Sequence, residues 1–343
     1  MPVKSIAGGF RALQAMVLDT PGPVESQPLA MRDLDPPHPG PGQVRLRVTA
    51  CGVCRTDLHT VEGELAAPRL PVVPGHQIVG VVEDVGEGVT PEKVGTRAGV
   101  AWMAGACGVC SFCRSGRENL CPEARFTGLH VDGGYAQLAV ARADFTYPLP
   151  PGFSDEQAAP LLCAGVIGYR ALRLAGALAG GRLGIFGFGA SAHVAIQVAL
   201  HAGCEVLVFT RSQLHRQHAL RLGATWVGAP PDRSPAPLDH AVVFSPAGEQ
   251  VVEALRRLAR GGTVACAGVT MSDLPGFPYS LIYHERVVRS VANATRTDAR
   301  ELLELAAQIP ITTSVEVLPL AEANDALARV KHSQVTGALV LRP

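Results

Sequence analysis

Short runs of apolar residues, partly alternating with polar ones, occur at 12–19, 43–50 and 77–86. The last run is rich in Val and closed by Gly, and all three runs predict β-strands. Residues 21–42 instead hold many Pro and Gly and show no apolar period, so we expect a loop-rich segment there. The first part of the chain is therefore predicted to be a β-rich domain with irregular connections.

From residue 154 the pattern changes. Residues 155–175 have the apolar period of a helix. Strands and helices then alternate, with strands expected at 182–188, 205–211, 239–245, 263–269 and 287–293, and helices at 191–203, 213–224 and 249–262. This order predicts an α/β domain whose parallel sheet is covered by helices on both faces.

The tail from about residue 294 holds two more helical stretches and a strand, at 296–308, 320–330 and 337–342. Periodicity does not decide whether this tail joins the α/β domain or returns to the β-rich one.

The length suggests two domains of ordinary size or one large one, and the composition is apolar enough for well-packed cores. The 343 residues are 47% hydrophobic with a formal net charge of zero, so we expect no nucleic-acid partner. The first residues lack the apolar segment of a secretory signal. The uncharged stretch 183–201 is broken by Gly and polar residues, which indicates strand, turn and helix rather than a membrane span. We therefore expect a soluble, cytoplasmic protein without membrane contact.

Four cysteines lie within fifteen residues in the pattern C-x2-C-x2-C-x7-C: Cys107, Cys110, Cys113 and Cys121. Four thiolates close a tetrahedral shell around zinc and leave no position for a substrate, so a structural zinc site is predicted. An iron–sulfur cluster is the alternative, since a Pro follows the last cysteine, but the x7 gap fits ferredoxin patterns poorly. A run of unliganded thiols is the remaining alternative.

The tetrapeptide CGVC of that cluster also occurs at 51–54, in different surroundings. No further cysteines lie nearby, and the βαβ context of a thioredoxin-like redox motif is missing. One Cys, one His and one Cys can form a zinc site with an open fourth position. Candidates for such a site are far apart in sequence, and spacing alone leaves them open between ligand and core residue: Cys54, His76 and Cys163.

A glycine turn stands between a predicted strand and a predicted helix, in IFGFGASA. Gly187 and Gly189 occupy the first two positions of the G-x-G-x-x-G/A pattern, and Ala192 the third. Within a βαβ unit this pattern brings the backbone close to a dinucleotide pyrophosphate at a helix N-terminus. A tight turn without a ligand is the alternative.

The next strand ends in VFTRS, with Thr210, Arg211 and Ser212. NAD sites usually carry Asp or Glu at this place for the ribose 2′-hydroxyl. An Arg without an acid favours the 2′-phosphate of NADP(H), because a guanidinium pairs with phosphate. A solvated surface charge at Arg211 is the alternative.

Together these pieces resemble the zinc-dependent alcohol dehydrogenases of the medium-chain dehydrogenase/reductase superfamily. The resemblance spans nearly the whole chain and rests, in family order, on GVCRTDLH, PGHQIVGVVEDVG, CGVCSFCRSGRENLC, DGGYAQLAV, LLCAGVIGYRAL and GFGASA. It implies a GroES-like catalytic domain at 1–153 and 294–343, interrupted by a Rossmann domain at 154–293. Similar proteins form dimers and tetramers, so it also implies a homo-oligomer.

The resemblance implies a catalytic zinc held by Cys54, His76 and Cys163, while Cys51, Cys204 and Cys266 are left as core residues. It implies hydride transfer between a primary alcohol and NAD(P).

 The reaction is then the interconversion of a primary alcohol and an aldehyde, with NADPH-dependent aldehyde reduction as the alternative working direction.

The resemblance also assigns roles to the residues after Cys54. Thr56 and His59 match a proton relay that runs through the cofactor ribose to solvent, for which an imidazole has a suitable pKa. Asp57 matches the carboxylate that orients the ligand His76, and Arg55 matches a contact to the cofactor phosphates.

Two residues depart from the family pattern. Gln77 follows the ligand His76 where a Glu is usual, and Ile167 stands where many members carry a Thr near the nicotinamide.

Two other classes of protein are alternatives to the dehydrogenase. A zinc-ribbon binding protein would need a basic surface around its cysteines, and a zinc-free quinone reductase would lack both cysteine sets.

Overall fold

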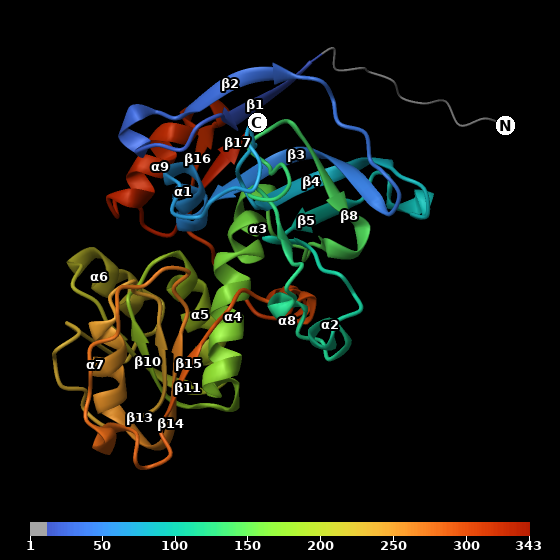
Figure 1. Cartoon of the computed structure of the whole chain (residues 1–343). Helices are drawn as coiled ribbons and strands as arrows, with labels where there is room; N and C mark the ends of the chain where they lie inside the picture. Colours follow the sequence, from blue (N-terminus) through green and yellow to red (C-terminus); the bar gives the residue numbers. More distant parts are fainter. Residues whose placement is uncertain (1–11) are drawn as a thin grey trace.

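The computed structural model describes residues 12–343, which form two units, each built around its own β-sheet (Figure 1). Residues 1–11 lie outside the described part. They make up most of the stretch from which we expect no secretory signal. The two predicted fold types, a β-rich domain and an α/β domain with a parallel sheet, are both confirmed.

The first unit is built on a seven-stranded sheet in the order β16-β17-β3-β4-β5-β9, with β8 pairing to β3 beside this path. Its strands are β3 (Gln43–Val53), β4 (Gln77–Val85), β5 (Arg97–Val100), β8 (Leu138–Arg142), β9 (Thr146–Pro148), β16 (Val315–Pro319) and β17 (Ala338–Arg342). β17 runs antiparallel to β3, with Leu339 opposite Val53, so the tail strands belong to the first sheet. The boundaries 1–153 with 294–343, and 154–293, stay a prediction.

A hairpin and a small lobe complete this unit. β1 (Leu13–Leu18) pairs antiparallel with β2 (Leu29–Leu34), and β6 (Met103–Gly105) pairs with β7 (Arg125–Phe126). Segment 21–42 is loop-rich, as expected, but it also contains the unexpected strand β2. Only the first residue of β2 is buried, so this strand has no apolar alternation to reveal it, and its pairing with β1 holds it in place.

The second unit is a six-stranded sheet in the order β12-β11-β10-β13-β14-β15, and every pair in it is parallel. Its strands are β10 (Gly181–Phe186), β11 (Cys204–Phe209), β12 (Trp226–Gly228), β13 (Leu238–Val243), β14 (Leu258–Cys266) and β15 (Val287–Ser290). The order reverses at β10, and such a switch point is where doubly wound sheets bind their ligands.

Helices cover both sheets (Figure 1). They are α1 (Arg55–Glu62), α2 (Ser111–Arg114), α3 (Asp155–Ala158), α4 (Ala164–Ala175), α5 (Ala190–His201), α6 (Gln213–Arg221), α7 (Glu249–Arg257), α8 (Arg296–Ala306) and α9 (Ala323–Lys331). The helix expected at 249–262 ends at Arg257, because Leu258 is already buried in β14 and Gly261 has a positive φ of 75°.

The stretch 155–175 is long and apolar enough to cross a membrane, but 67% of an apolar 18-residue segment within it is buried inside the protein. It consists of α3, a 3-10 turn that contains Pro160, and α4, which packs against α5 and α8. These helices are core elements. The uncharged stretch 183–201 forms β10, the glycine turn and α5, as expected.

Segment 290–296 connects β15 to α8 and passes close to both units. Its end is fixed by Asp298, which is fully buried and caps α8 through Thr295. Arg170 of α4 donates a hydrogen bond of 2.6 Å to the same carboxylate. This buried pair holds the segment in one position against α4.

Candidate active site

Three side chains from distant elements meet at one point. Cys54 ends the extended backbone of β3 and caps α1, His76 directly precedes β4, and Cys163 directly precedes α4. Their ligand atoms all lie within 4.8 Å of one another, and the two sulfurs are 3.9 Å apart. The fold thus brings together the three residues whose sequence spacing alone did not distinguish metal ligands from core residues.

Asp57 organises this cluster. Its Oδ2 accepts hydrogen bonds from the backbone N–H of Cys54 at 2.9 Å and from the hydroxyl of Tyr135 at 3.2 Å. Its Oδ1 lies 2.7 Å from Nδ1 of His76, and both side chains are buried. The carboxylate therefore fixes the imidazole with Nδ1 on its own side and Nε2 directed away from it.

The electrostatics favour a cation at the centre of the cluster. A hydrogen bond from Cys163 holds the pKa of the Cys54 thiol well below its usual range, and the same contact raises the pKa of Cys163. Burial lowers the pKa of His76, but the Asp57 carboxylate outweighs it and raises that pKa to about 10. A metal ion would displace these protons and take their place.

The donor set fits zinc. His76 Nε2 is buried and has no hydrogen-bond partner within residues 12–343, which is costly unless an ion or ligand satisfies it. Two sulfurs and one imidazole nitrogen are borderline-soft donors that suit zinc, and three protein ligands leave a fourth position for substrate.

A chain of polar groups lies beside the cluster. The sulfur of Cys54 is 3.7 Å from Oγ1 of Thr56, at the start of α1. One turn further along α1, Nδ1 of His59 lies 2.6 Å from Glu64, whose side chain is half exposed. Nε2 of His59 lies 3.3 Å from the hydroxyl of Thr270, which follows β14 in the other unit. The buried imidazole thus has a carboxylate on one side and a hydroxyl of the other unit on the other.

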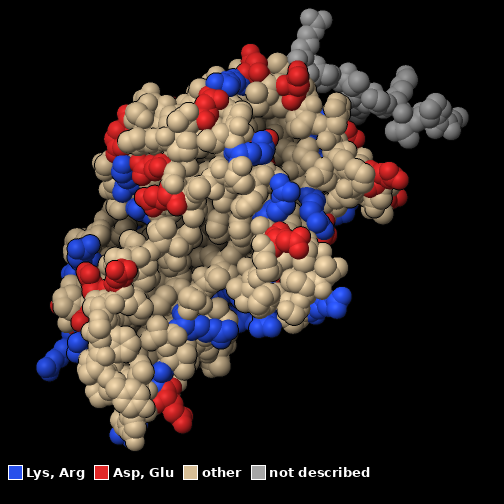
Figure 2. All heavy atoms as spheres, in the orientation of Figure 1, with Lys and Arg blue, Asp and Glu red and all other residues tan. Residues whose placement is uncertain are grey.

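A cavity of about 400 Å³ adjoins the cluster and is lined by residues of both units. Figure 2 shows the molecule hollowed between the two units, with charged side chains of both signs around the hollow. Thr56 and Cys163 line the cavity, as do Trp102, Met103 and Ile167. Leu129 is buried but does not line this cavity.

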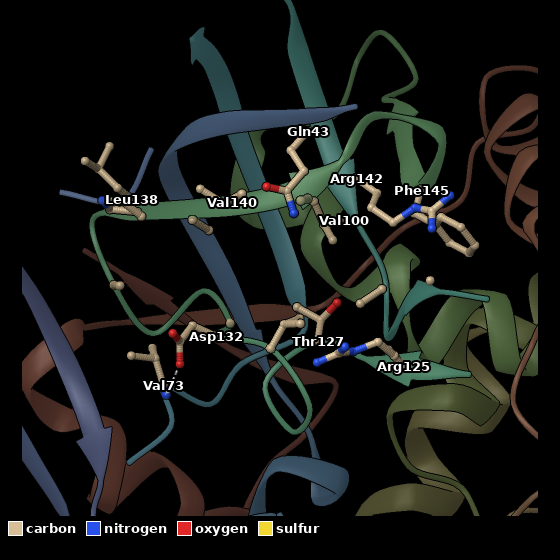
Figure 3. Close-up of a pocket in the computed structure, with 18 of the residues that line it drawn as sticks. Gln43, Val73, Val100, Arg125, Thr127, Asp132, Leu138, Val140, Arg142 and Phe145 are labelled. Atoms are coloured by element: carbon tan, nitrogen blue, oxygen red, sulfur yellow. Dashed lines mark hydrogen bonds between the residues drawn. The ribbon is translucent and has the colours of Figure 1, made fainter. Parts of the chain in front are cut away.

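A larger cavity of about 640 Å³ lies within the first unit, between β8 and the loop that follows β7 (Figure 3). None of the three clustered ligands lines it. Three of its charged lining residues are paired within the protein, Arg69 with Asp132 at 2.8 Å and Arg142 with Asp144 at 2.9 Å. Its size therefore does not make it the catalytic cavity.

The second cysteine cluster is local, as its spacing predicts. The ligand atoms of Cys107, Cys110, Cys113 and Cys121 lie within 4.8 Å of one another, with sulfur–sulfur distances of 3.5 and 3.9 Å for two pairs. Backbone N–H groups point at the sulfurs and lower the pKa of Cys107 to about 7. Such N–H groups stabilise thiolates around a metal.

The glycine turn joins β10 to α5 at the switch point of the parallel sheet. Gly187 has a positive φ of 84°, and a Cβ there would come within 3.0 Å of the backbone of Ser245. A Cβ at Gly189 would meet no atom within 4 Å, so open space lies in front of the helix N-terminus. Ala192 is buried in the core. This arrangement fits a dinucleotide pyrophosphate.

The residues after β11 lie at the adjacent edge of the sheet. Arg211 is exposed, and Ser212 caps α6 by accepting a hydrogen bond of 3.3 Å from the N–H of His215. Arg216 donates a hydrogen bond of 2.8 Å to the carbonyl of Thr210, which places a second guanidinium here. Arg55, predicted at the phosphates, donates to the last carbonyls of α9, at 3.1 Å from that of Val330.

Comparisons with known proteins identify the family of this chain. Residues 40–151 match the family model of the alcohol dehydrogenase GroES-like domain, and residues 192–308 match that of zinc-binding dehydrogenases. A probable alcohol dehydrogenase of Mycobacterium tuberculosis is 45% identical over 96% of this chain and 97% of its own. An alcohol dehydrogenase of Geobacillus stearothermophilus is 37% identical over 92% and 96%. The structure of a cinnamyl alcohol dehydrogenase from Sorghum bicolor matches with a TM-score of 0.88 and 30% identity, over 97% of this chain and 98% of its own.

The chain therefore belongs to the zinc-binding alcohol dehydrogenases of the medium-chain dehydrogenase/reductase superfamily. It is an oxidoreductase that acts on alcohols and aldehydes with NAD(P), with one catalytic and one structural zinc site.

Several residues at the site were missed by the sequence analysis. Tyr135, Glu64, Thr270 and Arg216 each contact a predicted site residue through a hydrogen bond. Tyr135 lies in DGGYAQLAV, which contributed to the resemblance but carried no role. The sequence gives no signal for the other three: Glu64 and Arg216 contact their partners within one unit, and Thr270 contacts His59 across the two units.

Proposed function

We propose that this alcohol dehydrogenase works as an NADPH-dependent reductase of aldehydes to primary alcohols. The observation that carries the proposal is the end of β11, where Arg211 and Arg216 are present and residues 210–216 include no Asp or Glu. A 2′-phosphate is attracted by these guanidinium groups, whereas the acid typical of NAD sites would repel it. Reduction follows as the working direction because cells generally keep the NADP pool reduced.

Similar folds accept either cofactor, so local residues must decide. An acetophenone reductase from Geotrichum candidum, 27% identical with a TM-score of 0.87, was solved in complex with NAD. A zinc-binding dehydrogenase from Sinorhizobium meliloti, 25% identical with a TM-score of 0.85, was solved bound to NADP. For this chain the two arginines favour NADP(H).

The residues around the cluster suit acid–base chemistry at the substrate oxygen. When bound, zinc supplies a Lewis acid that polarises this oxygen, and the nicotinamide supplies the hydride. The hydroxyl of Thr56, beside Cys54, gives the oxygen its proton. His59 replenishes the relay from its Nε2 side, while Glu64 holds the proton on Nδ1 and is exposed enough to exchange protons with water.

Gln77 and Ile167 set this chain apart from the family pattern. Oε1 of Gln77 is buried without a hydrogen-bond partner among the described residues, directly after the ligand His76. A neutral amide approaches zinc less readily than a carboxylate, so we propose slower ligand exchange at the metal. Ile167 lines the cavity and offers the cofactor ring an apolar contact in place of a hydroxyl.

The proposal is tested by initial rates of benzaldehyde reduction with NADPH and with NADH side by side. We expect a clear preference for NADPH. Arg211→Ala should weaken NADPH more than NADH, whereas Arg221→Ala, at the far end of α6, serves as the matched control and should change neither. Equal losses for the two cofactors would remove the role of Arg211, and a preference for NADH would overturn the cofactor assignment.

The chain is also proposed to form a homodimer, or a homotetramer built from such dimers, in the cytoplasm. β15 is the edge strand of the parallel sheet. Tyr279 and Tyr283 before this strand and Val287 within it expose large apolar side chains. An open edge with exposed aromatic residues favours pairing with a second copy. Light scattering of the purified protein would measure the oligomeric state.

A further inference from the structure

The catalytic cavity has an apolar, aromatic wall. Trp102 and Phe126 stack with their ring centroids 4.4 Å apart, and both line the cavity. Leu162, Val166 and Val291 add aliphatic side chains. Flat aromatic walls favour flat aromatic ligands, because rings stack on them with little loss of conformational freedom.

Two amide side chains break this apolar lining. Asn119, from the cysteine-rich lobe, and Asn293, from segment 290–296, both line the cavity. Oδ1 of Asn119 and Nδ2 of Asn293 are buried, and neither has a hydrogen-bond partner within residues 12–343. Unsatisfied buried groups of this kind are rare in folded proteins and cost about 1–3 kcal/mol each.

The orientation of both amides is fixed by the backbone. Nδ2 of Asn119 donates a hydrogen bond of 2.7 Å to the carbonyl of Ala292. Oδ1 of Asn293 accepts one of 2.7 Å from the N–H of Ala294. Asn119 therefore presents an acceptor and Asn293 a donor, and both are anchored on the same three residues of the chain.

The backbone at Asn293 is unusual as well. Its φ of 58° lies in the left-handed region, which non-glycine residues adopt at some cost. The segment is held there by the buried Asp298 at the start of α8. A side chain kept in a costly conformation beside the reaction site points to a role in binding.

We propose that Asn119 and Asn293 recognise a hydroxyl group on an aromatic substrate, at a position on the ring remote from the reacting aldehyde. A hydroxyl can donate to Oδ1 of Asn119 and accept from Nδ2 of Asn293 at the same time. The substrate class is then a hydroxyaryl aldehyde and its alcohol. This inference rests on the proposed aldehyde reduction.

The test compares ring substituents of matched size. Rates are measured with NADPH for 3- and 4-hydroxybenzaldehyde and for the corresponding methyl analogues. We expect kcat/KM for at least one hydroxyl isomer to exceed that of its methyl analogue by about ten-fold or more, because the methyl group leaves both amide atoms unpaired. A 4-methoxy analogue, which accepts but does not donate, should fall between them if the 4-position is the one recognised.

Two variants connect the preference to Asn293. Asn293→Gly suits the positive φ and removes the side chain, and Asn293→Asp keeps the acceptor for Ala294 but removes the donor. Both should bring the hydroxyl-to-methyl ratio close to one. Ser333→Gly, at another positive φ on the surface far along the chain, is the matched control and should leave the ratio as in the wild type.

Calorimetry provides a readout that does not depend on turnover. 4-Hydroxybenzyl and 3-hydroxybenzyl alcohol should bind the zinc-loaded enzyme more tightly than their methyl analogues, and Asn293→Asp should abolish the difference. Equal binding and equal rates for hydroxyl and methyl compounds would overturn the proposal. So would a rise in KM for NADPH alone in the Asn293 variants, which would assign the amide to the cofactor. Absence of any aldehyde turnover would contradict the proposed function, while the calorimetric comparison would still test the Asn pair.

Discussion

The two CGVC segments have the same four residues but differ in how many of their cysteines belong to a metal-ligand cluster. In the first copy Cys51 is buried inside the sheet on β3, and only Cys54, at the junction with α1, reaches the catalytic cluster. In the second copy both Cys107 and Cys110 lie in a loop and belong to one cluster. An extended strand points alternate side chains to opposite faces, whereas a tight loop turns its side chains and N–H groups toward one point.

The comparison shows how the backbone decides the chemistry of a cysteine. The four-cysteine cluster needs only a short stretch of chain, so its ligands close around the metal and leave no room for substrate. The catalytic cluster draws its ligands from the ends of β3, the entry to β4 and the entry to α4. Ligands on separate rigid elements can be held apart, which keeps one coordination position open.

The largest effect is expected for Cys54→Ser. Loss of the zinc Lewis acid removes several kcal/mol of transition-state stabilisation, so kcat/KM should fall by at least about 10³-fold. The melting temperature should change little, because β3 and α1 are held by the sheet and by the cap from Asp57. Wild-type rates in a sample of the variant whose zinc content has been measured would contradict the catalytic assignment.

Cys113→Ser should act on stability instead. Opening the four-cysteine shell should lower the free energy of unfolding by at least about 3 kcal/mol, a fraction of the binding energy typical of structural zinc. Metal analysis should show one zinc per chain lost, as for Cys54→Ser. Unchanged thermal melting would refute the structural role of this cluster.

The two cysteine clusters can be compared by their effect on acid stability only after the contribution of a third buried group, His193, has been removed. Burial, followed by the charge of His218, lowers the pKa of His193 from 6.5 to about 4, and neither ring nitrogen of His193 has a partner among the described residues. The unfolded chain then binds the proton first, so stability is full above pH 6.5 and falls by about 3 kcal/mol as the pH approaches 4.

His193→Leu should flatten this dependence in denaturant titrations between pH 6.5 and 4. The pH dependence that remains in the variant then reports on other groups, the two cysteine clusters among them. An identical slope in wild type and variant would show that His193 does not titrate on unfolding.

The smallest effect is expected for Cys51→Ala. The Cys51 sulfur packs closely against Gly75 and Gly134 and its loss leaves a small void, so about 1 kcal/mol of unfolding free energy should be lost. Activity and the zinc content should stay at wild-type values. A loss of zinc in this variant would mean that the first CGVC uses both of its cysteines.

The alternation of strands and helices predicted the parallel sheet, because its central strands β10, β11 and β13 are largely buried on both faces and stand out as apolar runs. β2 escaped prediction because its side chains are mostly exposed. Likewise the helix after residue 249 was expected to run too far, since the apolar residues that begin β14 continue its period.

For the site, local spacing was enough for the four-cysteine cluster, whose ligands are close in sequence. Cys54, His76 and Cys163 required the family resemblance, because no periodicity relates residues so far apart. Partners such as Glu64 and Tyr135 followed only from the folded structure, where hydrogen bonds cross between elements. The roles of the relay residues and of Arg211 stay predictions until the variants are measured.

The pairing of β17 with β3 has a consequence for how the protein is made. Leu339 lies opposite Val53, so the sheet that carries Cys54 remains incomplete until the ribosome has released residues close to position 342. The parallel sheet between residues 181 and 290 can form earlier, while the first unit waits with an open strand. During synthesis the cofactor unit would thus fold before the catalytic unit that encloses it in sequence, and the emerging β3 edge is the part of the chain most in need of protection by chaperones.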